Sequence, residues 1–408
     1  MTMFDPTVKA ARARLVNINP AIYAKSRNAL NGAVTRLSPY ITHSILTIPE
    51  AVAHLMGKYR LNFDDKLAFE FAWREFFHHV WSHLGDGIFK DIKPACWQGN
   101  YADKMPDDVL TGTTGIAAID LAITELYSTG YLHNHARMWV ASYLVHLRKV
   151  HWRVGAEWMY SHLLDGDLGS NHLSWQWVAA TFSAKPYLFN AENIEKFAPV
   201  QWHSRGTAID CDYPQLEEIA RTRPDVGPES EVKRKFSNAA KAPEIFSEPP
   251  KTILLSKEYQ NWLNIVPSDL PKKGLVHLVH PWNMSEYLVK VAGAKRRLGI
   301  IHLPFHAAHP WSMARWEFVL ARMREVTDMV FIGDATRLIP NLTSVHCVRT
   351  DNPGYRELLE ALAIKDLQLE PEPTQFVSPP EMCSSFTRFY QQTRQLSGKL
   401  VAVVDNRY

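Results

Sequence analysis

The stretch TGIAAIDLAITELYSTGYLHNHARMWVASYL, residues 114–144, predicts two helices joined by a short turn. Its first part carries apolar side chains at helical spacing, and Gly130 is a natural stop for that helix. The second part continues to Val150 and is apolar almost all round, which predicts a helix at the centre of its domain. Because an unpaired buried charge is very costly, Arg137 within this helix requires a partner.

Helical patterns extend on both sides of this stretch, over residues 40–180, and one of them, 156–164, ends at the run Asp165-Gly166-Asp167. Between residues 222 and 252 the composition shifts to Pro, Ser, Lys and Glu, which predicts a linker. We therefore expect two domains, 1–221 and 253–408, and a chain of 408 residues is long enough for both.

After the linker, short apolar runs alternate with helical stretches, such as 284–294 and 312–325. The runs are GLVHLVH (274–280), LGIIHLPF (298–305), DMVFIGD (328–334), SVHCVRT (344–350) and KLVAVVD (399–405). This alternation predicts a smaller, doubly wound α/β domain with a parallel sheet behind an all-helical domain. The usual glycine-rich dinucleotide and triphosphate loops do not occur in it.

Composition narrows the class of protein. Hydrophobic residues make up 46% and charged residues 21%, which is typical of a soluble globular protein. No run approaches the roughly 18 apolar residues of a membrane span, and no secretory signal precedes the helices. The four cysteines are far apart, which favours reduced thiols in the cytoplasm. A net charge of +3 neither requires nor excludes nucleic acid, because a local basic groove is enough for binding.

Six stretches follow one another along the helical part: TRLSPY (35–40), EFAWREF (70–76), residues 114–144, HWRVGAEWM (151–159), LLDGDLGSNHLSWQW (163–177) and FN (189–190). In this order they resemble the FAD-binding domain of the photolyase/cryptochrome family. The resemblance covers about residues 20–195 and implies an FAD cofactor. The family carries an α/β antenna domain before the flavin domain, whereas here the α/β pattern follows it. The order therefore resembles a circular permutation, and whether a second antenna chromophore binds is left open.

The resemblance also assigns cofactor-binding residues. The positions that match the phosphate and ribityl region are Tyr23, Thr35, Arg36, Leu37, Ser38 and Arg74. Arg137 and Asp165 match a buried ion pair beside the flavin, which would answer the need for a partner. Gly166 and Asp167 follow in the same run, and Asp167 matches the carboxylate at the ring edge or ribityl chain. Asn171 matches the residue that faces the reactive flavin nitrogen.

Three tryptophans match the family's electron-transfer chain: Trp175 is proximal, Trp152 is in the middle and Trp97 is distal. Tryptophan is readily oxidised, so closely spaced indoles relay an electron toward an excited flavin. Taken alone, each of these tryptophans is more simply interpreted as core packing.

A further set matches the family's pocket for a cyclobutane pyrimidine dimer. These residues are Glu70, Trp73, Asn134, Met138 and Trp177, with Arg27 and His135 at DNA-contacting positions. A dimer is poorly stacked, so flipping it out of the duplex costs less than flipping a normal base. Glu70 must be protonated to donate to a dimer carbonyl, and an apolar pocket raises the pKa of a carboxyl in that direction.

Some features depart from the family. His135 stands where photolyases commonly have Arg, so we expect weaker DNA binding. The segment after Trp177 lacks the usual glycine-rich loop, and the helices before the linker are shortened. His78, His79 and His83 have helical spacing without a fourth ligand, so we interpret them as ordinary helix residues and predict no metal site.

The leading hypothesis is therefore a DNA photolyase that uses blue light and reduced FAD to split pyrimidine dimers in damaged DNA. A second hypothesis is a cryptochrome-like photoreceptor, which photoreduces FAD without repair and signals to a protein partner. A flavoprotein with a different substrate is a third. The fold cannot decide among them, because function depends on the site.

Overall fold

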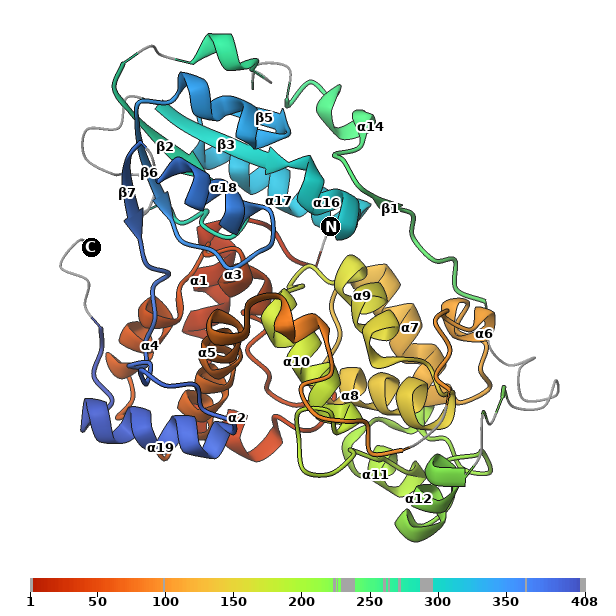
Figure 1. Ribbon diagram of the computed structural model, residues 1–408. Coiled ribbons are helices and arrows are strands. Elements are labelled where there is room, and N and C mark those ends of the chain that lie inside the picture. The colour runs from red at the N-terminus through yellow and green to blue at the C-terminus, as the bar shows by residue number, and fades with distance from the viewer. Residues whose placement is uncertain are drawn as a thin grey trace.

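Helices build the first half of the chain, as the apolar periodicity predicts (Figure 1). The computed structural model describes residues 3–97, 100–222, 225, 227–228, 239–259, 262, 265–270, 273–286, 296–363 and 365–403. The helices of the first half are α1 (Val8–Val16), α2 (Pro20–Ser26), α3 (Ser38–Thr42), α4 (Ile48–Met56), α5 (Lys66–Leu84), α6 (Asp107–Leu110), α7 (Ala117–Thr129), α8 (Asn134–Ser142), α9 (Trp152–His162), α10 (Leu168–Ala179), α11 (Ala191–Phe197) and α12 (Tyr213–Thr222). Shorter turns are η1 (Gly85–Phe89), η2 (Tyr143–Leu147) and η3 (Val200–Trp202).

Local sequence accounts for the ends of these helices. Gly130 adopts the left-handed conformation, with φ 65°, and terminates α7 where the sequence predicts a stop. The predicted helix from 135 to 150 is confirmed as α8, but it continues as the π-helical turn η2 and ends at Leu147. Asp167 caps α10 by accepting a hydrogen bond from the backbone N–H of Ser170 at 2.7 Å.

The second half contains a parallel sheet. Its elements are β1 (Ile245–Phe246), α14 (Lys251–Leu254), η4 (Pro267–Asp269), β2 (Leu275–Val279), β3 (Arg296–His302), α16 (Leu303–Ala308), β4 (Trp311–Ser312), α17 (Met313–Val326), β5 (Met329–Gly333), η5 (Ala335–Asn341), β6 (Ser344–Val348), α18 (Tyr355–Leu362), β7 (Asp366–Glu370) and α19 (Phe386–Ser397). Four of the predicted strands are confirmed as β2, β3, β5 and β6, and the helix predicted at 312–325 is confirmed as α17.

The five strands lie in the order β5-β3-β2-β6-β7, and every neighbouring pair is parallel. Counted along the chain this order is 3-2-1-4-5, the doubly wound arrangement, whose direction reverses between β2 and β6. Because parallel crossovers are right-handed, α17 and α18 lie on opposite faces of the sheet. The short strands β1 and β4 form a separate antiparallel pair.

One predicted strand is wrong. Residues 399–403 of the run at 399–405 form no strand, and 404–405 lie outside the described residues. The chain leaves the sheet after β7, and α19 then lies beside α5 in the helical half (Figure 1). The carbonyl of Val401 accepts a hydrogen bond from the Gln375 side chain instead of from a strand, at 2.8 Å. The predicted helix at 284–294 also lies mostly outside the described residues, as does much of the predicted linker.

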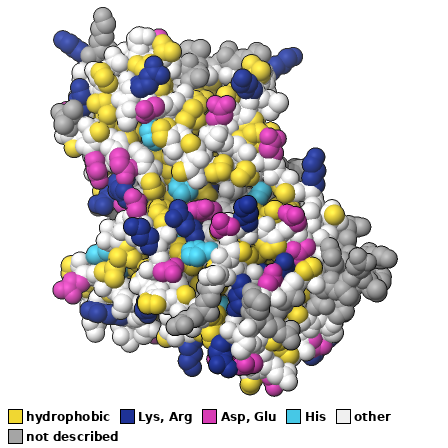
Figure 2. All heavy atoms as spheres, turned by 45° about the vertical axis from the view of Figure 1, so that its right-hand side comes forward, with side chains coloured by type: hydrophobic (Ala, Val, Ile, Leu, Met, Phe, Trp, Pro, Cys, Tyr) yellow, Lys and Arg dark blue, Asp and Glu magenta, His cyan; other side chains and the backbone are white. Residues whose placement is uncertain are grey.

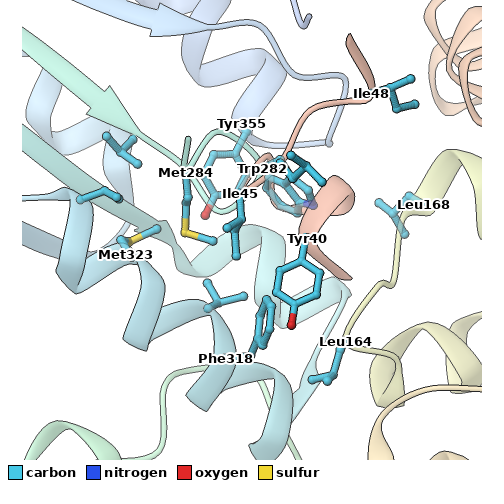
Figure 3. Close-up of a cluster of buried hydrophobic side chains, with 14 of the residues drawn as sticks. Tyr40, Ile45, Ile48, Leu164, Leu168, Trp282, Met284, Phe318, Met323 and Tyr355 are labelled. Atoms are coloured by element: carbon cyan, nitrogen blue, oxygen red, sulfur yellow. The ribbon is translucent and has the colours of Figure 1, made fainter. Parts of the chain in front are cut away.

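A shared core joins the two halves. Figure 3 shows Tyr40 of α3 beside Phe318 of α17, with ring centroids 6.1 Å apart. At the carboxyl end of β2, the carbonyl of Trp282 accepts a hydrogen bond from the Ser44 hydroxyl at 2.8 Å. The carboxyl edge of the sheet therefore faces the helical half. Among the described helices, none is both long and apolar enough to cross a membrane.

Candidate functional site

A cavity of about 300 Å³ lies among the helices of the first half. Its walls come from α3, α5, α8, α9, α10 and the loop before α10. Its polar lining is Ser38, Thr42, Glu70, Arg74, Asn134, Arg137, Asp165, Asp167, Ser170, Asn171 and Ser174, and its apolar lining includes Trp73, Phe77, Leu132, Met138, Met159, Leu163, Trp175 and Val178. We call this the central cavity. It brings together most of the site residues predicted from the sequence.

Arg137 finds the partner that an arginine in a central helix requires. Its guanidinium donates to both oxygens of Asp165, at 3.0 and 2.8 Å, and to the carbonyl of Leu132 at 2.8 Å. Ser38 at the start of α3 also donates to Asp165. The Asp165 side chain is 3% exposed, so these donors are what make its burial tolerable.

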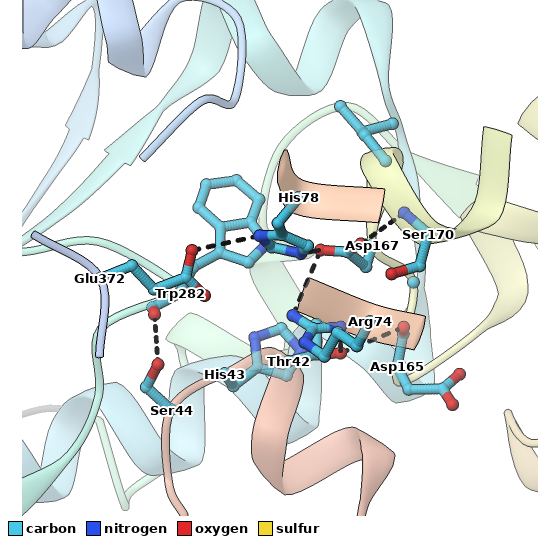
Figure 4. A network of polar contacts seen from close by, with 12 residues as sticks. Thr42, His43, Ser44, Arg74, His78, Asp165, Asp167, Ser170, Trp282 and Glu372 are labelled. Atoms are coloured by element: carbon cyan, nitrogen blue, oxygen red, sulfur yellow. Dashed lines mark hydrogen bonds and ion pairs between the residues drawn. The ribbon is translucent and has the colours of Figure 1, made fainter. Parts of the chain in front are cut away.

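The second carboxylate of the loop, Asp167, is held by α5 (Figure 4). Arg74 and His78 contact its Oδ2 at 3.3 and 3.0 Å. Burial alone would raise the pKa of Asp167, but the charges of Arg74 and His78 outweigh it and hold this pKa well below the usual range. One wall of the central cavity therefore carries two carboxylates, each contacted by basic side chains.

Asn171 on α10 donates its amide N–H to the carbonyl of Ala156 at 2.8 Å. That bond leaves its Oδ1 as the acceptor available to the central cavity. Trp175, one turn further along α10, is buried and lines the same cavity. A Cβ at Gly155 would lie 2.4 Å from the Trp175 ring, so the absence of a side chain there allows α9 and this indole to approach.

The other two predicted electron-transfer residues lie close to α9 and η2. Trp152 is buried one turn before Gly155, and its indole N–H donates to Asp91 at 2.6 Å. The Trp97 indole N–H donates to His146 at 3.1 Å. The Trp175 ring thus packs against α9 at Gly155, which is one turn along that helix from Trp152.

At the end of the cavity with the predicted dimer-pocket residues, several of these side chains already contact other residues of the chain. Glu70 forms an ion pair with Arg27 at 2.8 Å, and Asn134 contacts the Met138 sulfur at 3.6 Å. Burial raises the pKa of Glu70, although Arg27 opposes this. The Trp73 indole stacks on Phe386 of α19, with centroids 4.0 Å apart and planes at 7°.

Other predicted residues lie at the rim or away from the central cavity. Trp177 packs against Tyr187, at 6.1 Å between ring centroids, and is not part of the cavity lining. His135 lines a smaller cavity of about 120 Å³ next to the central one and stacks on Trp139. Gly166 has its carbonyl bound by the Arg315 guanidinium at 2.5 Å.

The residues predicted for the phosphate region line a continuation of the central cavity. The smaller cavity shares Ser38, Glu70 and other lining residues with it, and Tyr23, Thr35 and Arg36 connect the smaller cavity to a third one of about 370 Å³. Leu37 is fully buried and is not part of the lining of these cavities. The three cavities together reach the size typical of cofactor sites, about 300–1,000 Å³.

The sequence does not predict three residues of this site, which are His78, Arg315 and Glu372. His78 was interpreted as an ordinary helix residue, but it lies between Asp167 and Glu372 of the second half. Arg315, on α17, is fully buried and donates to the carbonyls of Tyr160 in α9 and of Gly166, which lies between the two carboxylates. No local signal marks these residues, because their partners lie at least 89 positions away along the chain. Among the described residues, no cluster of His, Cys, Asp or Glu is suited to a metal ion.

These features suit FAD. A flat isoalloxazine ring needs apolar walls and polar groups at its edge, and the lining of the central cavity combines Met159, Leu163 and Val178 with the amide of Asn171. The polar continuation past Thr35 and Arg36 suits a phosphate-bearing tail.

Comparison with known proteins agrees with this geometry. Residues 67–221 match the FAD-binding domain of DNA photolyase. The deoxyribodipyrimidine photo-lyase of Streptomyces griseus is 35% identical over 164 residues, which cover 40% of this chain and 35% of that protein. The chloroplastic/mitochondrial cryptochrome DASH of Solanum lycopersicum is 33% identical over 167 residues, which cover 39% of this chain and 29% of that protein. The solved archaeal photolyase from Sulfolobus tokodaii, with two FAD molecules, is 24% identical, with a TM-score of 0.42 over 56% of this chain and 53% of that one.

The helical site thus defines an FAD-dependent flavoprotein. Within residues 67–221 the chain matches the FAD-binding domain of the photolyase/cryptochrome family. Its matches span about a third of the length of the curated relatives, so activity and partners for the whole protein are argued separately below.

Proposed function

We propose that this protein is a blue-light-dependent DNA photolyase that splits cyclobutane pyrimidine dimers. The observation that carries the proposal is the shared cavity: Glu70, Trp73 and Asn134 line the same space as Asn171 and Trp175. A flipped dimer held by the first group would therefore lie next to a flavin held by the second. FAD, when bound, supplies light absorption and the electron that is passed to the dimer.

The proposed roles follow from the chemistry of each side chain. Glu70, with its raised pKa, is suited to donating a hydrogen bond to a dimer carbonyl. Asn134 presents an amide to the same rings, and Trp73 offers an aromatic wall. Arg27 has to exchange its ion pair with Glu70 for a DNA phosphate, and this exchange would free the carboxyl at the moment of binding.

The remaining assignments complete the proposal. Trp97, Trp152 and Trp175 form the electron-transfer chain that restores the reduced cofactor. The sheet of the second half corresponds to the family's α/β domain in a permuted order, following the helical domain along the chain. The doubly wound order of β2 to β7 supports that correspondence.

A repair assay tests the proposal. The full-length protein is loaded with FAD, reduced, mixed with an oligonucleotide containing one dimer, and assayed for dimer loss with and without blue light. We expect light-dependent repair that falls by about tenfold or more in Glu70→Ala and Asn134→Ala, because each loses a preorganised donor. Glu157→Gln is the matched control, since it removes a surface Arg–Glu pair on α9. DNA binding should also weaken steeply with salt.

The photoreceptor alternative has its own support in the site. Arg27 neutralises Glu70, Phe386 covers one face of Trp73, and Trp177 lies outside the cavity lining. Each of these features reduces the space or the donors for a dimer. If the flavin-loaded protein photoreduces normally but leaves dimers intact, the photolyase proposal is wrong and the photoreceptor function is favoured.

A further inference from the structure

His78 lies between carboxylates from the two halves of the chain (Figure 4). Its Nε2 is 3.0 Å from Asp167, which caps α10 and lines the central cavity. Its Nδ1 is 3.1 Å from Glu372, which follows β7. Carboxylates accept hydrogen bonds, so a ring that serves both must carry a proton on each nitrogen.

The surrounding charges favour that cationic form. Burial alone would lower the pKa of His78, but Asp167 and Glu372 outweigh burial and the opposing charge of Arg74, raising this pKa to about 10. The same imidazolium helps to keep Glu372 ionised, because its charge lowers the pKa of that carboxyl. At neutral pH the site therefore holds two carboxylates and two cations in one connected group.

Glu372 is fixed in place by the segment that carries it. Three residues further on, the backbone N–H groups of Gln375 and Phe376 donate to Glu75 of α5, at 2.7 and 2.9 Å. Ser378 contacts His79 of the same helix at 2.8 Å. The segment after β7 is thus bonded along α5, and the carboxyl that faces His78 is part of this rigid contact.

We propose that His78 is a positioning residue for the flavin site, which holds Asp167 toward the central cavity while Glu372 of the second half fixes the imidazolium. This proposal rests on the proposed binding of FAD in that cavity. It assigns the second half of the chain a role in setting the potential of the cofactor, because its charges lie next to Asp167, a carboxylate of the flavin site.

The charges of His78 and Glu372 act on a bound flavin with opposite sign. Loss of the imidazolium leaves more negative charge beside the cavity, which disfavours the electron-rich reduced cofactor. Loss of the Glu372 carboxylate removes negative charge and favours it. A residue that merely stabilised the fold would produce no such pair of opposite shifts.

The test measures the flavin midpoint potential at pH 7 in full-length FAD-loaded protein. We expect His78→Gln to lower the ratio of reduced to oxidised flavin at fixed ambient potential by roughly tenfold, a negative shift of about 30 mV for a two-electron couple. Glu372→Gln should shift the potential in the positive direction, and His78→Arg should restore most of the wild-type value because it keeps a cation and donors. His83→Gln is the matched control, since His83 contacts backbone carbonyls of His79 and Pro380 and is absent from the central cavity.

The possible failures are distinguishable. A wild-type protein that takes up no FAD contradicts the proposed function itself. Wild-type potential in both folded variants, or shifts of the same sign in both, overturns the role of His78 while leaving the proposed function intact. If His78→Gln does not fold, as judged by circular dichroism, the other two variants still decide the question. The role of His78 is overturned if Glu372→Gln gives no positive shift of the potential, or if His78→Arg gives a large shift.

Discussion

At the scale of single residues, the raised pKa of His78 makes the stability of the protein depend on pH. The folded-state pKa of His78 is about 10, whereas the side chain has an ordinary pKa of 6.5. A group whose pKa rises on folding contributes stability that is full below its unfolded pKa and is lost as pH rises through the folded value. The contribution of His78 is therefore complete below about pH 6.5 and disappears toward pH 10.

We predict that the free energy of unfolding of the wild-type protein falls between about pH 6.5 and pH 10, and that His78→Gln flattens this decline. Chemical denaturation at several pH values measures both curves. His83→Gln should follow the wild type, because the His83 ring contacts the Ser82 hydroxyl and the backbone carbonyls of His79 and Pro380. Parallel curves for wild type and His78→Gln would contradict the assignment of the proton to His78.

The same residues show what sequence can predict at this scale. The need for a partner for Arg137 followed from a charge within an apolar helix, and Asp165, its partner, stands in a recognisable run. His78 gave no such signal, because it stands on a mixed helix and its second partner, Glu372, is 294 positions away. Pairing across that distance depends on how two halves dock, which periodicity does not encode.

At the scale of elements, α19 supports α5. Phe386 is 5% exposed and stacks on Trp73, which lines the central cavity. Tyr390, one turn later, donates its hydroxyl to the carbonyl of Phe63 at 2.6 Å. Through these contacts a helix that belongs to the end of the chain holds an aromatic wall of the candidate site.

We predict that Phe386→Ala destabilises the protein by about 3–5 kcal/mol, the usual cost of removing a buried phenyl ring. Gln391→Ala, at an exposed position of α19, should change stability by less than about 0.5 kcal/mol. Urea denaturation measures both, and near wild-type stability for Phe386→Ala would show that α19 does not hold α5. The proposed light-driven repair should also weaken if Trp73 loses its fixed orientation.

Elements with strong periodicity were predictable, and marginal ones were not. The helix before Gly130 and the strand at 328–334 have clear apolar patterns. Strand β7, DLQLE, was missed because it is an edge strand with alternating polar residues. The run at 399–405 looked more like a strand, but α19 carries it away from the sheet edge.

At the scale of the whole molecule, the two halves share buried polar groups as well as a core. Glu75 of α5 is 8% exposed and accepts backbone N–H groups from Gln375 and Phe376, and burial, only partly offset by these bonds, raises its pKa to about 8. Arg315 of α17 donates to carbonyls of Tyr160 and Gly166. Figure 2 shows charged and histidine side chains gathered across the middle of the visible face, where the upper and lower parts meet.

Such an interface makes the helical half dependent on the rest of the chain. Without the second half, Glu75 loses both of its donors and the loop between Asp165 and Asp167 loses the Arg315 contacts. Phe69 and Trp73 would also expose faces that now pack on Phe386. Each loss either leaves a polar group unpaired or uncovers apolar surface next to the cavity.

We therefore predict that residues 1–222 produced alone bind FAD at least about tenfold more weakly than the full chain, or aggregate, because two or more such losses exceed the roughly 1.4 kcal/mol of a tenfold change. The matched control is residues 1–222 and 239–408 produced together in one cell, which cuts the chain but retains the interface and should restore FAD binding. Flavin fluorescence titration and size-exclusion chromatography measure the two outcomes. A monomeric 1–222 fragment with full-chain affinity would mean that the flavin site is built by the helical half alone, whatever the order of the domains along the chain.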